Sequence, residues 1–436
     1  MKLKAKFSLP NPLHKLSTKS LYDSQCHISE ILQNYHRLRF QQNETQTTYY
    51  CHGDMIMNTQ ATTAETTSSS MRWVRWANLA FMLYVLLVAV SMVSSGFKWS
   101  VGEQAKTLFE FASHPVAGLM IGLIATALIQ SSSTVTSIIV GLVAGGLPVE
   151  TAIPMVMGAN IGTTLTNTIV SLGHARCKVE FRRAFASATV HDIFNLLAVA
   201  IFLPLEMMFG LLDKISQWLV SPMLEAGDMS MKGLNFMKPL TQPAVDIVKG
   251  PLETFGNVGG IALIFIGIAL IFMAITTMGK LMRSLMVGRA RDILKSAIGR
   301  GPLHGIASGA VVTILVQSSS TTTSLMVPLV GTGVLKVRDV YPFTLGANIG
   351  TCITALLAAT AISGEYAVFA LQIALVHLVF NLLATIVIFG IPVLRELPLK
   401  GAFFLGDLAT KSKAAVAGYI AFVFLIIPGS ILAFTA

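Results

Sequence analysis

Long blocks of apolar residues, separated by short polar or basic segments, fill the chain from about residue 76 onward. Several blocks reach about 20 residues, which is long enough for a helix to cross the hydrocarbon core of a bilayer. The blocks are unbroken, whereas a membrane β-barrel would show alternation within segments of about ten residues. The pattern therefore predicts an all-α integral membrane protein with about seven transmembrane helices, near residues 76–96, 151–172, 184–209, 259–278, 340–362, 367–393 and 415–434.

Two further apolar blocks, at about 115–146 and 302–335, are interrupted by polar residues. The interruptions read IQSSSTVTS from Ile129 and VQSSSTTTS from Val316. Irregular, polar backbone at membrane depth is tolerated only where it is buried in protein or lines a water-filled cavity. We therefore interpret each block as a re-entrant hairpin that enters and leaves on the same side, with the motif QSSS at its tip.

The chain contains an internal repeat, because three motifs recur in the same order at separations of 186 to 188 positions. Shared apolar composition alone cannot produce the same polar and glycine-containing motifs twice, so the two halves are structural repeats. The repeated motifs are G-x3-T-x3-QSSS at Gly122 and Gly309, GANIGT at Gly158 and Gly346, and H-x-x-FNLL at His191 and His377.

Basic residues test this topology, since they concentrate in cytoplasmic loops. If the hairpins do not cross, each half has three crossings and the second half is inverted. The basic groups at 72–75, 176–183, 280–300 and 395–413 then all fall in the cytoplasm. If the hairpins crossed fully, two of these groups would lie outside. We therefore predict an inverted repeat with two opposed hairpins and a cytoplasmic amino terminus, a common plan of secondary transporters.

These boundaries divide the chain into five predicted segments. The first segment is polar and without sustained periodicity, which is typical of a disordered tail; a translation start at Met55 or Met57 is an alternative explanation of it. The segments are a cytoplasmic tail at 1–70, transport repeat 1 at 71–209, an extracytoplasmic loop at 210–255, transport repeat 2 at 256–394, and a cytoplasmic loop with the last transmembrane helix at 395–436.

The composition agrees with a membrane protein: 53% of the 436 residues are hydrophobic and 12% are charged, against about a quarter charged in soluble domains. The net charge of +10 would favour nucleic acid as a partner of a soluble protein. Here the basic residues lie between apolar blocks, so membrane topology explains them. The lipid bilayer is the expected partner, and nucleic acid is not.

The hairpin tips offer chemistry for both an anion and a cation. Helix ends expose N–H groups, which favour anions, and free carbonyl groups. Serine and threonine hydroxyls both donate and accept hydrogen bonds, and together with amide oxygens they are hard, neutral ligands suited to Na⁺. The predicted phosphate- and sodium-contacting residues are Gln130, Ser131, Ser132, Ser133, Gln317, Ser318, Ser319 and Ser320.

Each motif also has a structural interpretation. Serine and threonine often hold membrane helices together, the glycines of GANIGT would allow close packing or a kink, and Asn195 and Asn381 could be satisfied structural amides. His191, Asp192 and Ser131 also permit a serine hydrolase hypothesis. However, the second repeat lacks the acid after its histidine and the chain has no GxSxG motif, so we expect no enzymatic activity.

With these motifs the chain resembles the type II sodium–phosphate cotransporter family. The resemblance covers about 100–390 and rests on the duplicated QSSS and GANIGT motifs, TNTIVSL, and EFRRAFASATVHDIFNLL. It implies uptake of inorganic phosphate across a plasma membrane, driven by Na⁺ as the coupling ion, by alternating access around a QSSS-lined site, with no other cofactor. The predicted sodium-binding residues are Asn160, Thr163, Thr164, Asn195, Asn348, Thr351 and Asn381.

The chain departs from the family pattern at two positions. Cys177 stands where the charge-moving animal members have an acidic residue, and Ala347 replaces a serine of the sodium site of some members. The number of Na⁺ ions per phosphate therefore stays open, and we expect little net charge to move. Lys178 and Arg183 are possible counter-charges for phosphate. Another oxyanion such as sulfate or arsenate, or an anion channel, remains an alternative, and the sequence does not define an oligomeric state.

Overall fold

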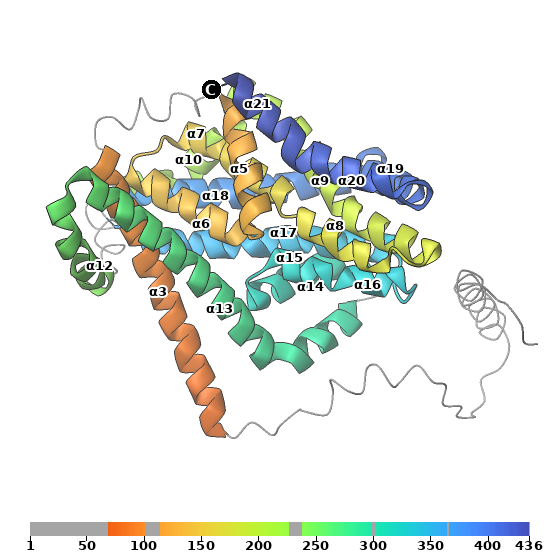
Figure 1. Ribbon diagram of the computed structural model, residues 1–436, viewed down its shortest axis with the longest axis horizontal. Helices are drawn as coiled ribbons and strands as arrows, with labels where there is room; N and C mark the ends of the chain where they lie inside the picture. Colours follow the sequence, from red (N-terminus) through yellow and green to blue (C-terminus); the bar gives the residue numbers. More distant parts are fainter. Residues whose placement is uncertain (1–68, 102–113, 226–237, 298–300, 364–365, 436) are drawn as a thin grey trace, which may run out of the picture. The chain divides into compact units, whose positions relative to one another are not determined.

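A computed structural model describes residues 69–101, 114–225, 238–297, 301–363 and 366–435. Most of the described residues are helical and none forms a strand, which confirms the predicted all-α class (Figure 1). Nearly all of the predicted tail, 1–70, lies outside the described residues. Six helical segments are long and apolar enough to cross a membrane: Trp73–Ser100, Lys178–Phe209, Asn257–Leu281, Val337–Thr360, Ala367–Phe389 and Lys413–Phe434.

The seventh predicted crossing, at 151–172, is present as two shorter helices. They are α7 (Val149–Gly162) and α8 (Leu165–Ser171), and Thr163 and Thr164 separate them. The equivalent segment of the second repeat is one continuous helix, α17 (Val337–Thr360). The two repeats therefore differ at this point, although both carry GANIGT.

The QSSS motifs interrupt helices in both repeats. In the first, α5 (Pro115–Ile129) is followed by α6 (Ser132–Gly145). In the second, α14 (Pro302–Val316) is followed by α15 (Ser319–Ser324) and α16 (Met326–Gly331). The glutamine ends one helix and the next serine begins another. That the two segments enter the membrane as re-entrant hairpins, from opposite sides, stays a prediction.

Two segments expected as loops are helical instead. The segment expected as a cytoplasmic loop from 395 is mostly α19 (Pro392–Lys411), and the connection at 210–255 contains α10 (Leu211–Glu225) and α12 (Lys238–Leu252). These helices are amphipathic and rich in charge, and their low hydropathy therefore led to the prediction of loops. Likewise Lys178 and Arg183 belong to the first turns of α9 (Lys178–Phe209) rather than to a loop.

The remaining elements complete the two halves. They are α3 (Ser69–Val101), η2 (Leu172–His174), η4 (Glu253–Phe255), α13 (Asn257–Ala297), α18 (Ala367–Ala384), η5 (Thr385–Phe389), α20 (Lys413–Ala421), η6 (Phe422–Ile426) and α21 (Ile427–Thr435).

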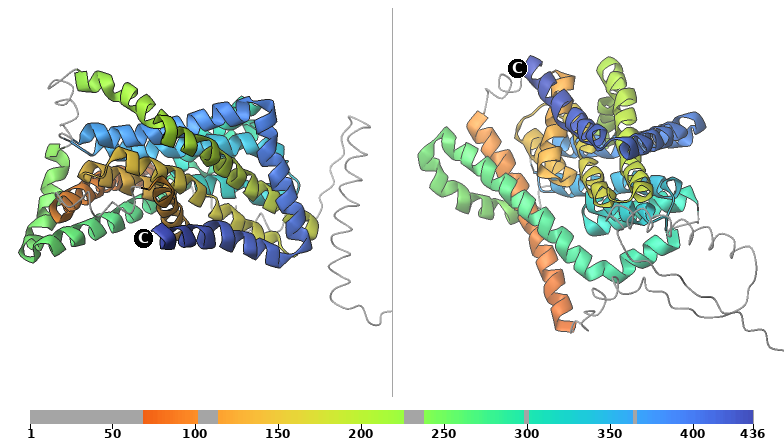
Figure 2. Two further views of the ribbon diagram at one scale, coloured as in Figure 1. Left: turned by 90° about the horizontal axis from the view of Figure 1, so that it is seen from above. Right: turned by 45° about the vertical axis from the view of Figure 1, so that its right-hand side comes forward.

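The two repeats interlock instead of packing as separate bodies. Helix α9 of the first repeat packs against α16 of the second, and α18 of the second packs against α6 of the first. Helices α3 and α13 lie against each other beside this bundle (Figure 2). The hydrophobic core extends through both halves. Each QSSS segment therefore contacts helices of the other repeat as well as of its own.

Glycines of the repeated motifs let pairs of helices approach closely. A Cβ on Gly158 would lie 1.9 Å from the carbonyl oxygen of Leu119, and a Cβ on Gly346 would lie 1.9 Å from that of Ile306. In both repeats the GANIGT helix thus contacts the backbone of the helix that leads to QSSS. The structural interpretation of these glycines, close helix packing, is correct.

We expect Gly158→Ala and Gly346→Ala each to destabilise the fold by about 1–3 kcal/mol, because overpacking forces the two backbones apart. Thermal unfolding of the purified protein in detergent measures the effect. Gly173→Ala is the matched control, since a Cβ there meets nothing within 4 Å. Unfolding temperatures of both variants equal to that of the control would contradict the close-packing role.

Candidate functional site

Each QSSS motif builds the same local structure. Gln130 and Gln317 have φ of 58° and 55° and are the only non-glycine residues with positive φ in the described part of the chain. Their N–H groups bond the carbonyl oxygens of Thr126 and Thr313 and end the preceding helices. Glycine normally occupies such left-handed positions. Retention of glutamine at both breaks therefore indicates a use for its side chain.

The glutamine side chains are held by threonines. Gln130 Oε1 accepts a hydrogen bond from Thr166 Oγ1 at 2.7 Å, and Gln317 Oε1 accepts one from Thr354 Oγ1 at 2.9 Å. Neither threonine was predicted as a site residue from the sequence. The internal repeat is a signal that could have identified them, because the two threonines are 188 positions apart, as are the two GANIGT motifs.

The first serine of each motif begins the next helix. Ser131 Oγ accepts from the N–H of Thr134, and Ser318 Oγ accepts from that of Thr321, both at 3.2 Å. This is ordinary N-terminal capping by serine. Because this capping already occupies Ser131 and Ser318, they are less available to a ligand than the serines that follow them.

The third serine of each motif reaches across to the other repeat. Ser133 Oγ shares a 2.8 Å hydrogen bond with Thr351 Oγ1. Ser320 Oγ donates to the carbonyl oxygen of Thr163 at 3.4 Å. These contacts are related by the repeat, since Thr163 and Thr351 end the two GANIGT motifs. The structure thus brings both QSSS motifs beside the GANIGT motif of the opposite half.

The middle serines differ from their neighbours. Ser132 and Ser319 are 3% and 2% exposed. Among the described residues, neither hydroxyl has a hydrogen-bond partner. Buried polar groups are normally hydrogen-bonded. Two buried hydroxyls without protein partners, at matched positions of the two repeats, are therefore available to a ligand.

The predicted sodium-binding asparagines bond to one another. Asn160 Nδ2 donates to Asn381 Oδ1, and Asn348 Nδ2 donates to Asn195 Oδ1, both at 2.8 Å. The two central histidines complete this network: His377 Nε2 donates to Asn160 Oδ1 at 3.0 Å and His191 Nε2 to Asn348 Oδ1 at 2.7 Å. The amides thus hold the repeats together, as their structural interpretation requires. An amide oxygen has two lone pairs, so this role does not prevent cation binding.

The remaining predicted site residues are Thr164, Lys178 and Arg183. The hydroxyl of Thr164 donates to the carbonyl oxygen of Ile161 at 2.8 Å. Lys178 is exposed and Arg183 is half-buried at the amino end of α9, about 18 Å or more along the helix axis from Asn195. The structure therefore does not place the two possible counter-charges beside the amide network.

The hydrolase hypothesis finds no support in the geometry. The nitrogens of His191 contact Asn348 and, at 3.5 Å, Asn167. Ser131 serves as a helix cap, and Asp192 accepts from Thr168 and Tyr419. Among the described residues, these three candidate side chains do not bond to one another, so they form no catalytic triad.

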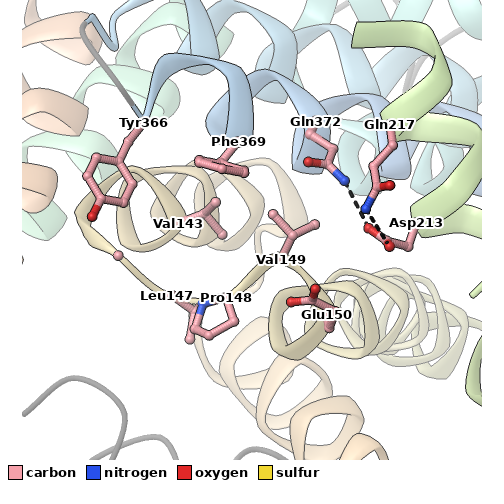
Figure 3. A pocket seen from close by; sticks show the side chains of 11 residues that line it. Val143, Leu147, Pro148, Val149, Glu150, Asp213, Gln217, Tyr366, Phe369 and Gln372 are labelled. Carbon is pink, nitrogen blue, oxygen red and sulfur yellow. Dashed lines mark hydrogen bonds between the residues drawn. The ribbon is translucent and has the colours of Figure 1, made fainter. Parts of the chain in front are cut away.

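A separate cavity of about 180 Å³ lies at one end of the bundle. It is bordered by the turn between α6 and α7, by α10 and by the start of α18 (Figure 3). The amides of Gln217 and Gln372 point toward Asp213 and donate to its carboxylate at 2.7 and 2.9 Å. Burial, and then the negative charge of Glu150, raise the pKa of Asp213 above its ordinary value.

This shift predicts a pH dependence of stability. The folded state holds the Asp213 proton more tightly than the unfolded state does. The protonated carboxyl therefore contributes to the stability of the fold at a pH below its ordinary pKa, and this contribution is lost as the pH rises through the raised pKa. We expect Asp213→Asn to flatten the fall in unfolding temperature as the pH rises above about 4, the ordinary pKa of an aspartate. Asp246→Asn, which alters an exposed carboxylate of α12, should keep the wild-type slope. An unchanged slope in Asp213→Asn would show that the carboxyl does not carry the effect.

The fold and the site together define an integral membrane protein built from two interlocked helical repeats, with a buried hydroxyl and amide cluster where the repeats meet. The family model described as Na⁺/Pi-cotransporter matches residues 85–238 and 270–394. The chain belongs to this family. No solved structure matches it.

Curated relatives agree with this assignment. The chain is 33% identical to sodium-dependent phosphate transport protein 2A of Ovis aries, over 79% of this chain and 65% of that protein. The Rattus norvegicus 2A protein is also 33% identical, over 78% of this chain and 64% of the relative. Sodium-dependent phosphate transport protein 2B of Homo sapiens is 32% identical, over 78% and 62%. The chain thus spans less than two thirds of the length of these relatives.

Proposed function

We propose that the protein is a Na⁺-coupled symporter that carries inorganic phosphate into the cell. Its relatives are named as sodium-dependent phosphate transport proteins. The observation that carries the proposal is the pair of buried hydroxyls, Ser132 and Ser319, which lack protein partners within the described residues. A tetrahedral oxyanion accepts hydrogen bonds on all its oxygens, so a phosphate bound between the two motifs would accept one from each hydroxyl.

The neighbouring groups support cation coupling. Thr351 and the carbonyl of Thr163 lie within hydrogen-bond distance of the third serines, and Asn160 and Asn348 precede these threonines by three residues in the GANIGT motifs. Such oxygens are neutral and hard, and discontinuous helices with free carbonyls are typical sodium sites of secondary transporters. A cation beside the phosphate offsets its negative charge, so that neither ion alone has to be desolvated within the protein.

Transport in this proposal proceeds by alternating access. The two repeats interlock through contacts that come in pairs related by the repeat. One member of such a pair can therefore loosen while the other tightens. The site would then open to one side of the membrane at a time. The protein would reside in a plasma membrane with its amino terminus in the cytoplasm. Because the cargo crosses unchanged, the activity needs no bond chemistry, and we assign no enzymatic function.

Uptake of radiolabelled phosphate into proteoliposomes tests the central claim. We expect saturable uptake driven by an inward Na⁺ gradient and its loss when choline replaces Na⁺. Competition by sulfate or arsenate in the same assay measures anion selectivity. Equal uptake in Na⁺ and choline would refute coupling, and uptake that does not saturate would favour the channel alternative.

Ser132→Ala and Ser319→Ala test the site. Each removes a hydrogen bond to a charged ligand, worth about 1.5–3 kcal/mol, so uptake at low phosphate should fall by about tenfold or more. Ser308→Ala is the matched control, because within the described ranges this buried hydroxyl bonds only the Gly305 carbonyl of its own helix. Protein yield and unfolding temperature show whether each variant folds. Normal uptake by both folded variants would exclude the serines from the site.

A further inference from the structure

Asp192 breaks the symmetry of the two repeats. It lies on α9 next to His191, and the equivalent position after His377 is Leu378. Its side chain is 0% exposed, and it forms no ion pair with any residue in the described ranges. Ionisable residues within membrane spans are costly and are usually paired or functional. The acid therefore needs an explanation that the repeat does not provide.

The two carboxylate oxygens of Asp192 have different surroundings. Oδ2 accepts hydrogen bonds from Tyr419 at 2.9 Å and from Thr168 at 3.2 Å. Oδ1 is buried and, among the described residues, has no hydrogen-bond partner. An uncompensated buried charge is strongly destabilising. The free oxygen thus points to a cation or a proton that belongs beside it.

A second asymmetry occurs at the same place. The helix break between α7 and α8, at Thr163 and Thr164, exists only in the first repeat, since α17 is continuous. The Thr164 side chain lies beside the carboxyl of Asp192. Its hydroxyl donates a hydrogen bond to the Ile161 carbonyl oxygen, so the lone pairs of the hydroxyl oxygen remain free to bind a cation. The break therefore adds a hydroxyl ligand to the carboxylate, in the one repeat that carries the acid.

We propose that Asp192, Thr164 and Thr168 bind one Na⁺ ion, and that this is a charged cation site present only in the first repeat. This inference rests on the proposed function and adds to it a residue that the family resemblance did not supply. A single carboxylate with hydroxyl oxygens neutralises a monovalent cation. A divalent cation would keep a net positive charge in the protein interior, and among the described residues no group of three acidic, histidine or cysteine ligands exists that could hold one.

The site is joined to the centre of the protein. The carbonyl of Thr163, adjacent to the proposed ligand Thr164, accepts from Ser320 of the second QSSS motif. Occupation of the cation site would therefore hold the α7–α8 break in place and, through Ser320, position the opposite hairpin. Tyr419 of α20 acts as a positioning residue, since its hydroxyl orients the carboxylate through Oδ2.

Sodium binding by the detergent-purified protein tests the inference without transport. We expect NaCl, but not choline chloride, to raise the unfolding temperature of the wild type, because a ligand stabilises the state that binds it. Asp192→Asn should lose most of this Na⁺-dependent increase. Its unfolding temperature in choline should equal or exceed that of the wild type, because the variant removes an uncompensated charge. Asp246→Asn is the control carboxylate and should keep the full increase.

Uptake in proteoliposomes provides the second measurement. In Asp192→Asn the Na⁺ concentration for half-maximal uptake should rise by about tenfold or more, which corresponds to about 1.4 kcal/mol. Asp192→Glu keeps the charge but moves it, so the ratio of Na⁺-driven to Li⁺-driven uptake should change. A residue with only a structural role would leave this ratio as it is.

The outcomes separate this inference from the proposed function. If the wild type takes up phosphate with Na⁺ and Asp192→Asn keeps both its Na⁺ activation and its Na⁺-dependent stabilisation, Asp192 holds a proton and the inference is wrong, whereas the proposed function stands. If the wild type shows no Na⁺-dependent uptake but its Na⁺-dependent stabilisation requires Asp192, the cation site stands and the proposed function fails.

Discussion

The hydrogen bonds that cross between the two repeats are the constraint on which the rest of the structure depends. Ser133 meets Thr351, Ser320 meets the Thr163 carbonyl, and the asparagines join in two related pairs. Each bond links residues more than 150 positions apart, within a bundle where water does not compete. Because an unsatisfied polar group there costs about 1–3 kcal/mol, these pairs determine how the repeats can meet.

This constraint explains why the helices are interrupted where they are. A continuous helix would use the backbone groups near QSSS internally and would leave the serines pointing along its sides. The left-handed glutamine and the capping serine instead end one helix and start another. The hydroxyls that follow are thereby presented to the opposite repeat. The close glycine packing of α5 on α7 and of α14 on α17 holds these breaks in position.

The departures from symmetry are as informative as the symmetry. One repeat has a broken helix and a buried acid, whereas the other has a continuous helix and a leucine at the matching positions. Two equal repeats around a centre would offer two equal sites. In the proposed arrangement the two halves would share the oxyanion site, whereas only the first repeat would supply a charged side chain to a cation.

The sequence by itself determined the class of fold, the repeat and the helix breaks at the two QSSS motifs, but not the break between α7 and α8. Hydropathy, motif spacing and capping chemistry act over a few neighbouring residues, which is why they can be recognised without the structure. The sequence also singled out the serines and asparagines of the centre. Only the tertiary structure decided their partners: that Asn160 bonds Asn381, that Gln130 is held by Thr166, and that Tyr419 reaches Asp192. It likewise revealed the helices at 211–225 and 392–411, whose low hydropathy resembles that of loops. Contacts between residues far apart in the chain leave no local pattern, since they arise only when the whole bundle packs.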